Sequence, residues 1–263
     1  MTQFAHRRNP RGVTSRTYSL TRVKAIALTA AALVLGLTAA LWQEIPHWRI
    51  GGSRSTASSS VAYLPEKLTC PDDAAAIAVI GDSHVAGSRM ESSGAPFGAV
   101  LAQRLGRRVK VALYGAGGAT AIRGEQRWRE RDLPDASLVI LAYGTNDAAP
   151  RGWLRDKTPV ALTEYRASLA RQIVGWRTGG RDVVLLAPPP GGSAAITARI
   201  TPYRRAAHDV GRMLGIAVLD PADAFASCPA AQPVLANDAL HMNAAGHQCL
   251  GTWLAHKFCP PTR

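Results

Sequence analysis

Residues 75–86 read AAIAVIGDSHVA, and this stretch decides which fold the sequence predicts. Its apolar part, Ala75–Ile80, has the composition of a buried strand and stops abruptly at the sequence Gly81-Asp82-Ser83-His84. The glycine permits a sharp turn, which leaves the serine hydroxyl at the carboxyl end of the strand. Open α/β sheets place their chemistry at these strand ends, so Ser83 is the first candidate functional residue.

Four further apolar runs follow this strand and alternate with amphipathic stretches. The runs are almost continuously apolar, as expected for strands that are covered on both faces. The predicted strands are Ala75–Ile80, Val109–Tyr114, Ser137–Tyr143, Asp182–Ala187 and Ile216–Leu219, and the predicted helices are Pro96–Leu105, a helix with apolar positions from Leu162 to Trp176, Pro202–Leu214 and Asn243–Lys257. This alternation predicts an α/β protein, a three-layer α/β/α sandwich with a five-stranded parallel sheet of the flavodoxin-like type, over residues 69–263.

Three segments are expected before this domain. Residues 1–22 form a basic tail, and the stretch that follows is uncharged from Ala25 to Trp42, about the minimum length that crosses a bilayer. Arginines precede it, so the positive-inside rule predicts a single-pass anchor over residues 23–42 with a cytoplasmic N-terminus. A cleaved signal peptide is the alternative, and both place the domain in the periplasm or outside the cell. Residues 43–68, rich in Gly and Ser, predict a flexible linker.

The net charge of +13 does not by itself predict a nucleic-acid-binding protein. Residues 1–70 carry 9 Lys and Arg against 2 Asp and Glu, which is about half of the excess and is explained by a membrane-proximal tail. The rest is mostly arginine spread along the domain, so no nucleic-acid partner is expected. Three of these arginines, at helical spacing around Trp128, indicate a solvated helix face or, as an alternative, a docking surface for an acidic glycan: Arg123, Arg127 and Arg131.

The other predicted strands also end in unusual sequence. The second is followed by a glycine-rich loop that contains Gly118, and the third by Gly144-Thr145-Asn146-Asp147. After the fifth strand the chain reaches Asp238-Ala239-Leu240-His241. Because the carboxyl ends of parallel strands share one edge, we expect Ser83 and these residues to meet in one crevice. The glycine-rich loop fits neither nucleotide-binding fingerprint, G-x-G-x-x-G or G-x-x-x-x-G-K-[ST].

Acyl transfer would use every one of these parts. A serine hydroxyl is a weak nucleophile until a base takes its proton, and His241 can be that base. Asp238, three residues earlier, can orient the ring and stabilise its charged form. The backbone N–H groups of Ser83 and Gly118 and the amide of Asn146 can bind the oxyanion. The chemistry requires no cofactor, and no cluster in the sequence has metal-ligand spacing.

At these residues the sequence resembles the SGNH (GDSL-like) hydrolases, over about residues 74–257. Gly81-Asp82-Ser83 is similar to the nucleophile block of that family, and Gly118 matches its oxyanion glycine. Gly144-Thr145-Asn146-Asp147 and Asp238-x-x-His241 match its two remaining blocks. The resemblance implies an esterase with the catalytic residues Ser83, Asp238 and His241 and the oxyanion donors Ser83, Gly118 and Asn146.

Four other residues near these blocks receive different interpretations. Asp82 and Asp147 are expected to hold backbone geometry instead of transferring protons. His84 departs from the leucine that many members of the family carry, and it is interpreted as either a substrate contact or a structural residue. Trp153, in the polar segment 149–157, is a candidate substrate contact.

The four cysteines all follow the apolar segment, so an oxidising compartment and two disulfides are expected. Sequence alone allows three pairings. The last helix should start at the active edge and end at the opposite edge, about where the first strand begins. This topology predicts Cys70–Cys259 and, by elimination, Cys228–Cys249, which would fasten the loop that carries Asp238.

The expected function is removal of small acyl groups, foremost O-acetyl, from a carbohydrate of the cell envelope or the extracellular space. One alternative is transfer of the acyl group to a polysaccharide or peptidoglycan hydroxyl by the same triad. Hydrolysis of lysophospholipids or thioesters is a second alternative, and it would require a broader apolar lid than residues 149–157 offer. The third is an inactive glycan-binding module, against which the complete triad argues.

Overall fold

The computed structural model describes residues 76–91, 93–106, 109–128, 136–149, 158–229 and 232–259. Within these ranges no helix is long and apolar enough to cross a membrane. The predicted tail, anchor and linker, over residues 1–22, 23–42 and 43–68, lie outside the described residues.

The described residues form an α/β domain in which strands and helices alternate, as the sequence predicts. The strands are β1 (Ala76–Gly81), β2 (Lys110–Gly115), β3 (Leu138–Ala142), β4 (Asp182–Leu186) and β5 (Val218–Leu219). The helices are α2 (Phe97–Leu105), α3 (Ala121–Arg127), α4 (Leu162–Thr178), α5 (Ala194–Leu214), α6 (Pro221–Ala226) and α7 (Ala244–Phe258). The first four strands lie within one or two residues of their predicted bounds, and β5 is two residues shorter.

The five strands form one parallel sheet in the order β2-β1-β3-β4-β5. The last residue of β1, Gly81, pairs with Gly115 of β2 and with Ala142 of β3. The neighbouring strands β2, β1 and β3 therefore stop at the same level, and the loops that follow them emerge side by side. The strand order β2-β1-β3 places the loop that carries Ser83, here called the nucleophile loop, between two others. These are the glycine-rich loop after β2 and the loop after β3 that carries Thr145 and Asn146.

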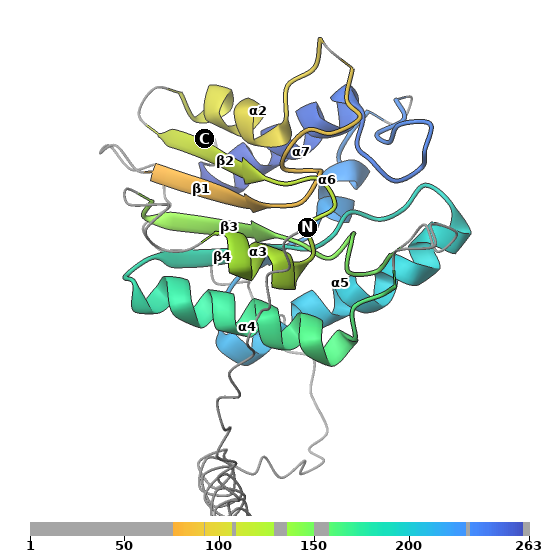
Figure 1. Cartoon of the computed structure of the whole chain (residues 1–263). Coiled ribbons are helices and arrows are strands. Elements are labelled where there is room, and N and C mark those ends of the chain that lie inside the picture. The colour runs from red at the N-terminus through yellow and green to blue at the C-terminus, as the bar shows by residue number, and fades with distance from the viewer. Residues whose placement is uncertain are drawn as a thin grey trace, which may run out of the picture. The chain divides into compact units, whose positions relative to one another are not determined.

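Helices cover both faces of this sheet (Figure 1). Helices α3, α4 and α5 bury their apolar sides against one face, where alternate residues of β1 such as Ile80 point. Helices α2, α6 and α7 cover the other face, toward which Ile77 and Val79 point. Because each strand feeds both clusters, its sequence is apolar throughout, which explains the continuous runs.

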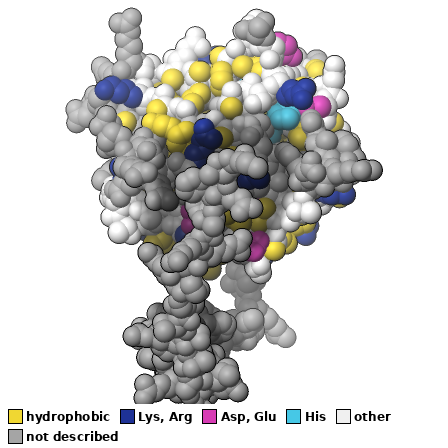
Figure 2. All heavy atoms as spheres, viewed as in Figure 1, with side chains coloured by type: hydrophobic (Ala, Val, Ile, Leu, Met, Phe, Trp, Pro, Cys, Tyr) yellow, Lys and Arg dark blue, Asp and Glu magenta, His cyan; other side chains and the backbone are white. Residues whose placement is uncertain are grey.

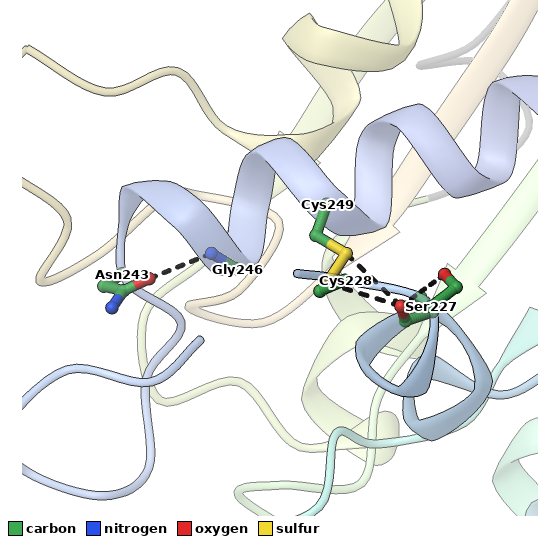
Figure 3. Close-up of a disulfide and its surroundings, with 6 residues drawn as sticks. Ser227, Cys228, Asn243, Gly246 and Cys249 are labelled. Atoms are coloured by element: carbon green, nitrogen blue, oxygen red, sulfur yellow. Dashed lines mark hydrogen bonds between the residues drawn. A yellow bond between two sulfur atoms is a disulfide. The ribbon is translucent and has the colours of Figure 1, made fainter. Parts of the chain in front are cut away.

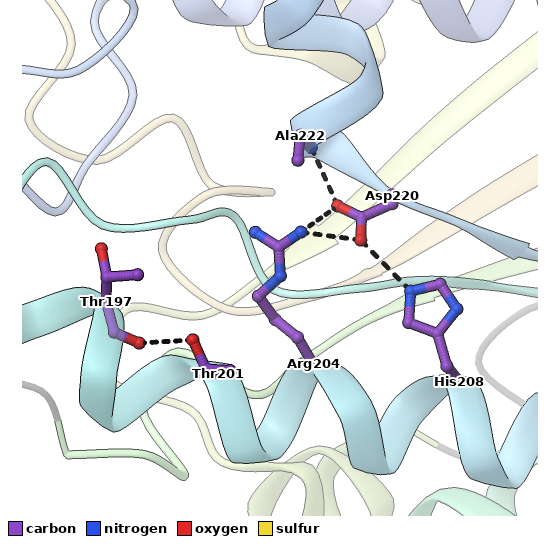
Figure 4. Close-up of polar contacts among 6 residues, drawn as sticks. All are labelled: Thr197, Thr201, Arg204, His208, Asp220 and Ala222. Atoms are coloured by element: carbon purple, nitrogen blue, oxygen red, sulfur yellow. Dashed lines mark hydrogen bonds and ion pairs between the residues drawn. The ribbon is translucent and has the colours of Figure 1, made fainter.

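The helix before β5 is longer than the sequence predicts. A start at Pro202 is the expectation, because proline is favoured in the first turn, but the helix begins at Ala194 and contains Pro202 in its interior. The Ser193 side chain caps the helix by accepting the Ile196 N–H, and the Thr201 hydroxyl donates to the Thr197 carbonyl beside the proline (Figure 4). A serine cap is a readable signal that the proline obscures.

The short helix α6 is absent from the sequence-based prediction. Asp220 caps it by accepting the Ala222 N–H at 2.9 Å, and Pro221 occupies its first position. Both oxygens of the same carboxylate accept hydrogen bonds from Arg204 Nη2 at 2.7 Å, and Oδ2 lies 3.2 Å from His208 Nε2 (Figure 4). Arg204 and His208 both belong to α5. These contacts tie the start of α6 to α5 across the end of β5. An Asp-Pro pair after a strand is the signal that could have predicted this helix.

Charged side chains are dispersed over the described surface. On the face shown in Figure 2, Lys and Arg side chains lie apart from one another among hydrophobic side chains. Arg123 and Arg127 lie on α3, and the Arg127 guanidinium lies 5.0 Å from the ring centre of Trp128. Arg131, the third member of that row, lies outside the described residues. On this face the described Lys and Arg side chains form no continuous basic stripe.

Candidate active site

Ser83 lies immediately after β1, at the edge of the sheet, where the sequence places it. A side chain at Gly81 would put a Cβ 2.4 Å from the carbonyl oxygen of Ala142, so only glycine fits where the strand ends. The turn is held by the Ser88 N–H, which donates to the Ser83 carbonyl at 2.9 Å. Ser83 is 5% exposed, so its hydroxyl is sheltered yet reachable.

Asp238 and His241 lie on one tight turn before α7. The Asp238 Oδ1 atom accepts the backbone N–H groups of Leu240 at 3.0 Å and of His241 at 2.9 Å. Ala239, between them, has a φ of 56°, a left-handed conformation that the turn requires. The turn is held from outside by the Gly192 N–H, which donates to the Ala239 carbonyl at 2.8 Å.

The three side chains form one continuous path. His241 Nδ1 lies 2.7 Å from Asp238 Oδ2, and His241 Nε2 lies 3.1 Å from Ser83 Oγ. Partial burial opposes ionisation of Asp238, but hydrogen bonds from the backbone and ring of His241 outweigh it and hold the pKa of Asp238 well below its ordinary value. A carboxylate that stays ionised beside Nδ1 favours the tautomer that leaves Nε2 free to accept a proton from Ser83.

The three predicted oxyanion donors follow the ends of the neighbouring strands β1, β2 and β3, which stop at the same level of the sheet. Gly118 follows β2 in a left-handed conformation, with a φ of 75°, and the preceding Ala116 N–H donates to the Gly81 carbonyl at 3.1 Å. Within the described part of the chain, the N–H groups of Ser83 and Gly118 donate to no protein acceptor. The Asn146 Nδ2 atom is buried and also makes no hydrogen bond among the described residues. The two backbone N–H groups are thus uncommitted, and the Asn146 amide influences the Asp82 carboxyl, whose pKa it lowers against the effect of burial.

Asp82 and Asp147 are buried carboxyls that hold the surrounding loops. Asp82 Oδ1 accepts the His84 N–H at 2.9 Å, and both oxygens of Asp147 accept the Ala121 N–H, the first of α3, at 3.1 Å. Burial raises the pKa of Asp82 to about 7, although the hydrogen bond from the His84 N–H opposes the shift. Burial likewise raises the pKa of Asp147 to about 7. These contacts to backbone groups support the expected role in backbone geometry.

His84 lies directly behind the candidate base. Its ring centre is 5.6 Å from that of His241, and the side chain is 4% exposed. Burial lowers the pKa of His84 to about 3, so the ring is neutral at pH 7. Both of its ring nitrogens are buried without a hydrogen-bond partner among the described residues, and it lines a small internal cavity with Asp82 and Thr145. His84 therefore packs against the candidate base and is shielded from substrate by the surrounding side chains, which favours the structural interpretation over a substrate contact.

Two residues that sequence reasoning missed connect the nucleophile loop to α7. Glu91 Oε2 accepts the Ala244 N–H at 3.0 Å, at the first turn of α7. His247 Nδ1 accepts the Phe97 N–H at 3.1 Å, and its ring stacks on that of Phe97. Sequence spacing carried no signal for either contact, because each joins residues about 150 positions apart. Trp153, the other candidate substrate contact, lies outside the described residues.

The predicted disulfide Cys228–Cys249 is present and joins the end of α6 to α7 (Figure 3). It closes a loop of the chain that includes Asp238 and His241, while Asn243 caps α7 through the Gly246 N–H at 2.9 Å. Cys259 is also disulfide-bonded. Its predicted partner, Cys70, lies outside the described residues, so that pairing stays a prediction. No cluster of His, Cys, Asp and Glu within the described ranges has the arrangement of a metal site.

Comparison with known proteins agrees with this geometry. The sequence model of the GDSL-like lipase/acylhydrolase family matches residues 79–249, and no curated protein sequence matches the chain. Similar solved structures include LAE5, an alpha/beta hydrolase enzyme from the metagenome of Lake Arreo, Spain, at 24% identity and a TM-score of 0.60, covering 74% of this chain and 100% of that one. A catalytic mutant of Axe2, an acetylxylan esterase from Geobacillus stearothermophilus, matches at 21% identity and a TM-score of 0.60, covering 71% and 94%. The lipase/acylhydrolase from Enterococcus faecalis matches at 23% identity and a TM-score of 0.58, covering 70% of this chain and 94% of that one.

At these identities the solved structures show a shared fold, whereas the family match covers most of the domain and includes the nucleophile, glycine and Asn146 blocks together with Asp238 and His241. The chain therefore belongs to the GDSL-like lipase/acylhydrolase family of carboxylic ester hydrolases.

Proposed function

We propose that the protein is a serine esterase that removes short acyl groups, foremost O-acetyl, from a carbohydrate outside the cytoplasmic membrane. Ser83 is the residue that carries the acyl group. The observation that carries this proposal is the continuous path from Asp238 through His241 to Ser83 Oγ.

Acylation of Ser83 is the first half of the reaction. His241 Nε2, 3.1 Å from the hydroxyl, accepts its proton while Oγ bonds to the ester carbonyl carbon. The tetrahedral intermediate collapses by breaking the bond between that carbon and the alcohol oxygen. The imidazolium of His241 gives its proton to this oxygen, so the sugar hydroxyl leaves neutral and the acyl group remains on Ser83.

Deacylation repeats these steps with water. His241 takes a proton from the water as its oxygen attacks the acyl carbon, and the bond to Ser83 Oγ then breaks. The proton on His241 returns to Oγ, and the carboxylic acid is released. Asp238 stabilises the imidazolium in both halves through the 2.7 Å contact, and its own proton affinity stays low because of its hydrogen bonds.

The oxyanion of each tetrahedral intermediate is bound by the N–H groups of Ser83 and Gly118 and by the Asn146 amide. Donors that are already oriented and desolvated need no reorganisation when charge develops, and in such sites this stabilisation typically lowers the barrier more than any other effect. A buried amide without a protein partner fits this role, since its hydrogen bond is made only when the substrate oxygen carries charge.

The described surface supports the proposal of a short acyl group. The exposed large hydrophobic side chains of the described residues, Val174 and Met213, lie near the carboxyl ends of α4 and α5. Those helices run back from the active edge, so both residues lie at the opposite edge, far from Ser83. No large hydrophobic side chain of the described residues is exposed near Ser83, where a long acyl chain would need apolar surface to bury.

The comparison with Axe2 supports an acetylated carbohydrate as the substrate. Axe2, which shares the fold, is an acetylxylan esterase, and the Axe2 variants described as catalytic mutants replace a serine, an aspartate and a histidine. The aspartate stands three positions before the histidine, the spacing of Asp238 and His241.

The location outside the membrane is proposed from the uncharged stretch at 25–42 and from the disulfide, which is typical of oxidising compartments.

A chain-length series of p-nitrophenyl esters, assayed with the full chain and with Ser83→Ala, tests the proposal. We expect kcat/KM to be highest for acetate, and loss of turnover in the variant with an unchanged unfolding midpoint. A preference for chains of eight carbons or more would favour the lipid or thioester alternative. Release of free acetate from an acetylated glycan supports hydrolysis, whereas its appearance on an acceptor glycan would favour the transferase.

A further inference from the structure

A second hollow of about 440 Å³ lies beside α7, away from Ser83. It is bounded by α7, by the end of α2, and by the segment that follows α6. We call it the α7 groove, and its described lining is Arg104, Ser227, Cys228, Pro229, Gln232, Val234, Ala245, Gln248, Cys249, Thr252, Trp253 and His256. The volume is within the range of small-molecule sites.

The residues from α7 form one stripe along the helix. They recur every three or four positions from Ala245 to His256, so the groove follows the helix for about 16 Å. The opposite side of α7, which includes Leu250 and Leu254, is buried against the sheet. A stripe of this length suits an extended ligand better than a compact one.

The lining combines flat apolar surface with neutral hydrogen-bonding groups. The ring of Trp253 is partly buried, and the Cys228–Cys249 disulfide with Pro229 continues the apolar floor. Gln232 and Gln248 add amides with both donors and acceptors. Sugar rings present apolar C–H faces and a rim of hydroxyls, so this mixture matches a carbohydrate more closely than a lipid.

The charge of the groove has one sign. Arg104 is the charged side chain of the lining, and the Lys257 ammonium lies 5.1 Å from the centre of the Trp253 ring. None of the residues that line it is Asp or Glu. A carboxylate-bearing ligand would therefore meet attraction and no like charge.

One end of the groove is built by the loop that carries the base. The Val234 carbonyl accepts the Asn243 N–H at 3.2 Å, two residues after His241, and Leu235 pairs with Met242. We propose that the α7 groove binds an anionic oligosaccharide segment of the substrate, beyond the sugar that carries the acyl group. This inference rests on the proposed function and names the alcohol side of the ester as an acidic glycan.

Binding of hexagalacturonate to the full chain, measured by titration calorimetry, tests the groove with maltohexaose as the neutral probe. We expect measurable affinity for the acidic probe, at least tenfold weaker affinity for the neutral one, and weakening by salt. Arg104→Glu and Gln248→Ala, both at exposed positions, should each weaken binding, the charge reversal by tenfold or more. Arg205→Glu, an exposed arginine on α5 across the sheet, is the matched control and should bind as the wild type does.

Unchanged affinity in both groove variants, or no binding of the acidic probe, would overturn the inference. Either result would be expected if another segment of the chain or a protein partner occupied the groove. Hydrolysis of p-nitrophenyl acetate separates this failure from that of the proposed function. It should be normal in the groove variants and lost in Ser83→Ala, while Ser83→Ala should bind the acidic probe normally.

Discussion

The carboxylate of Asp238 holds His241 twice, because Oδ1 accepts its backbone N–H at 2.9 Å and Oδ2 lies 2.7 Å from its ring Nδ1. One side chain thereby fixes both the path of the backbone and the orientation of the ring. The orientation of the ring is therefore set within the four-residue turn, while the Gly192 N–H holds that turn against the rest of the domain.

Asp238→Asn should separate these two effects. The asparagine oxygen can still accept the backbone N–H groups, so the loop should keep its fold, but the amide cannot stabilise the imidazolium. We expect kcat for p-nitrophenyl acetate to fall by about 10³–10⁴ with little change in the unfolding midpoint. A loss smaller than tenfold would remove Asp238 from the mechanism.

Asn146→Ala tests the oxyanion site. The Nδ2 atom has no acceptor within ordinary hydrogen-bond geometry among the described residues and only lowers the pKa of nearby Asp82, so its removal should cost the native state little. We expect kcat to fall by about 10²–10³ while KM stays near the wild-type value, because the interaction forms in the transition state. A change below about threefold would show that the amide does not bind the oxyanion.

His84→Leu should stabilise the protein. It removes two buried ring nitrogens that lack partners among the described residues, and each such group costs about 1–3 kcal/mol. The pKa of His84 is about 3 in the native state against 6.5 ordinarily, so between these values the unfolded chain binds a proton that the native state refuses. Native stability is therefore lost as pH falls below 6.5, and the gain from the substitution should grow by about 1.4 kcal/mol per pH unit.

Urea unfolding of both proteins at pH 7.5 and pH 5.0 measures this gain. The titrations of Asp82, Asp147 and His247 are common to both proteins and cancel in the difference. A gain that is equal at the two pH values would contradict the assignment of a neutral, buried ring at position 84.

Removal of the Cys228–Cys249 disulfide should cost both stability and activity. The bridge spans 21 positions, for which the chain-entropy model gives about 3 kcal/mol. The closed loop carries Asp238 and His241, so a double Cys→Ser variant should also lose kcat more steeply than it loses affinity for substrate. An active variant of unchanged kcat would show that the loop is held without the bridge.

Two glycine-to-alanine substitutions form a matched pair. A Cβ at Gly246, in the first turn of α7, would lie 2.1 Å from the Val234 carbonyl oxygen, so Gly246→Ala should destabilise the protein and displace the His241 loop. A Cβ at Gly175, in the exposed side of α4, would meet nothing within 4 Å. Gly175→Ala should raise the free energy of unfolding by about 0.5–1 kcal/mol, with activity unchanged. Thermal denaturation and p-nitrophenyl acetate turnover distinguish the two.

The strands and the juxtaposition of the site residues were predictable because both depend on local patterns. Continuous apolar runs identify strands that are covered on both faces, and parallel topology brings their carboxyl ends to one edge. Ser83, Gly118 and Asn146 each lie within four residues of a strand end, so their placement at one edge of the sheet needed no knowledge of side-chain packing.

What the sequence did not predict depends on contacts between distant residues. The start of α5 was masked by Pro202, whose effect on a helix is decided by the surrounding packing. Glu91 supports α7 through a backbone contact 153 positions away, which no periodicity records. The burial of both His84 nitrogens likewise follows from the way α2, α7 and the strand ends close around it.

Ser83 and His241 stand 158 positions apart, and only the finished sheet brings Oγ to Nε2. A growing chain therefore holds its nucleophile for most of its synthesis without the base that would activate it. Ser83 is therefore not activated until the loop that carries His241 has packed against the sheet, so ester cleavage reports directly on completed folding.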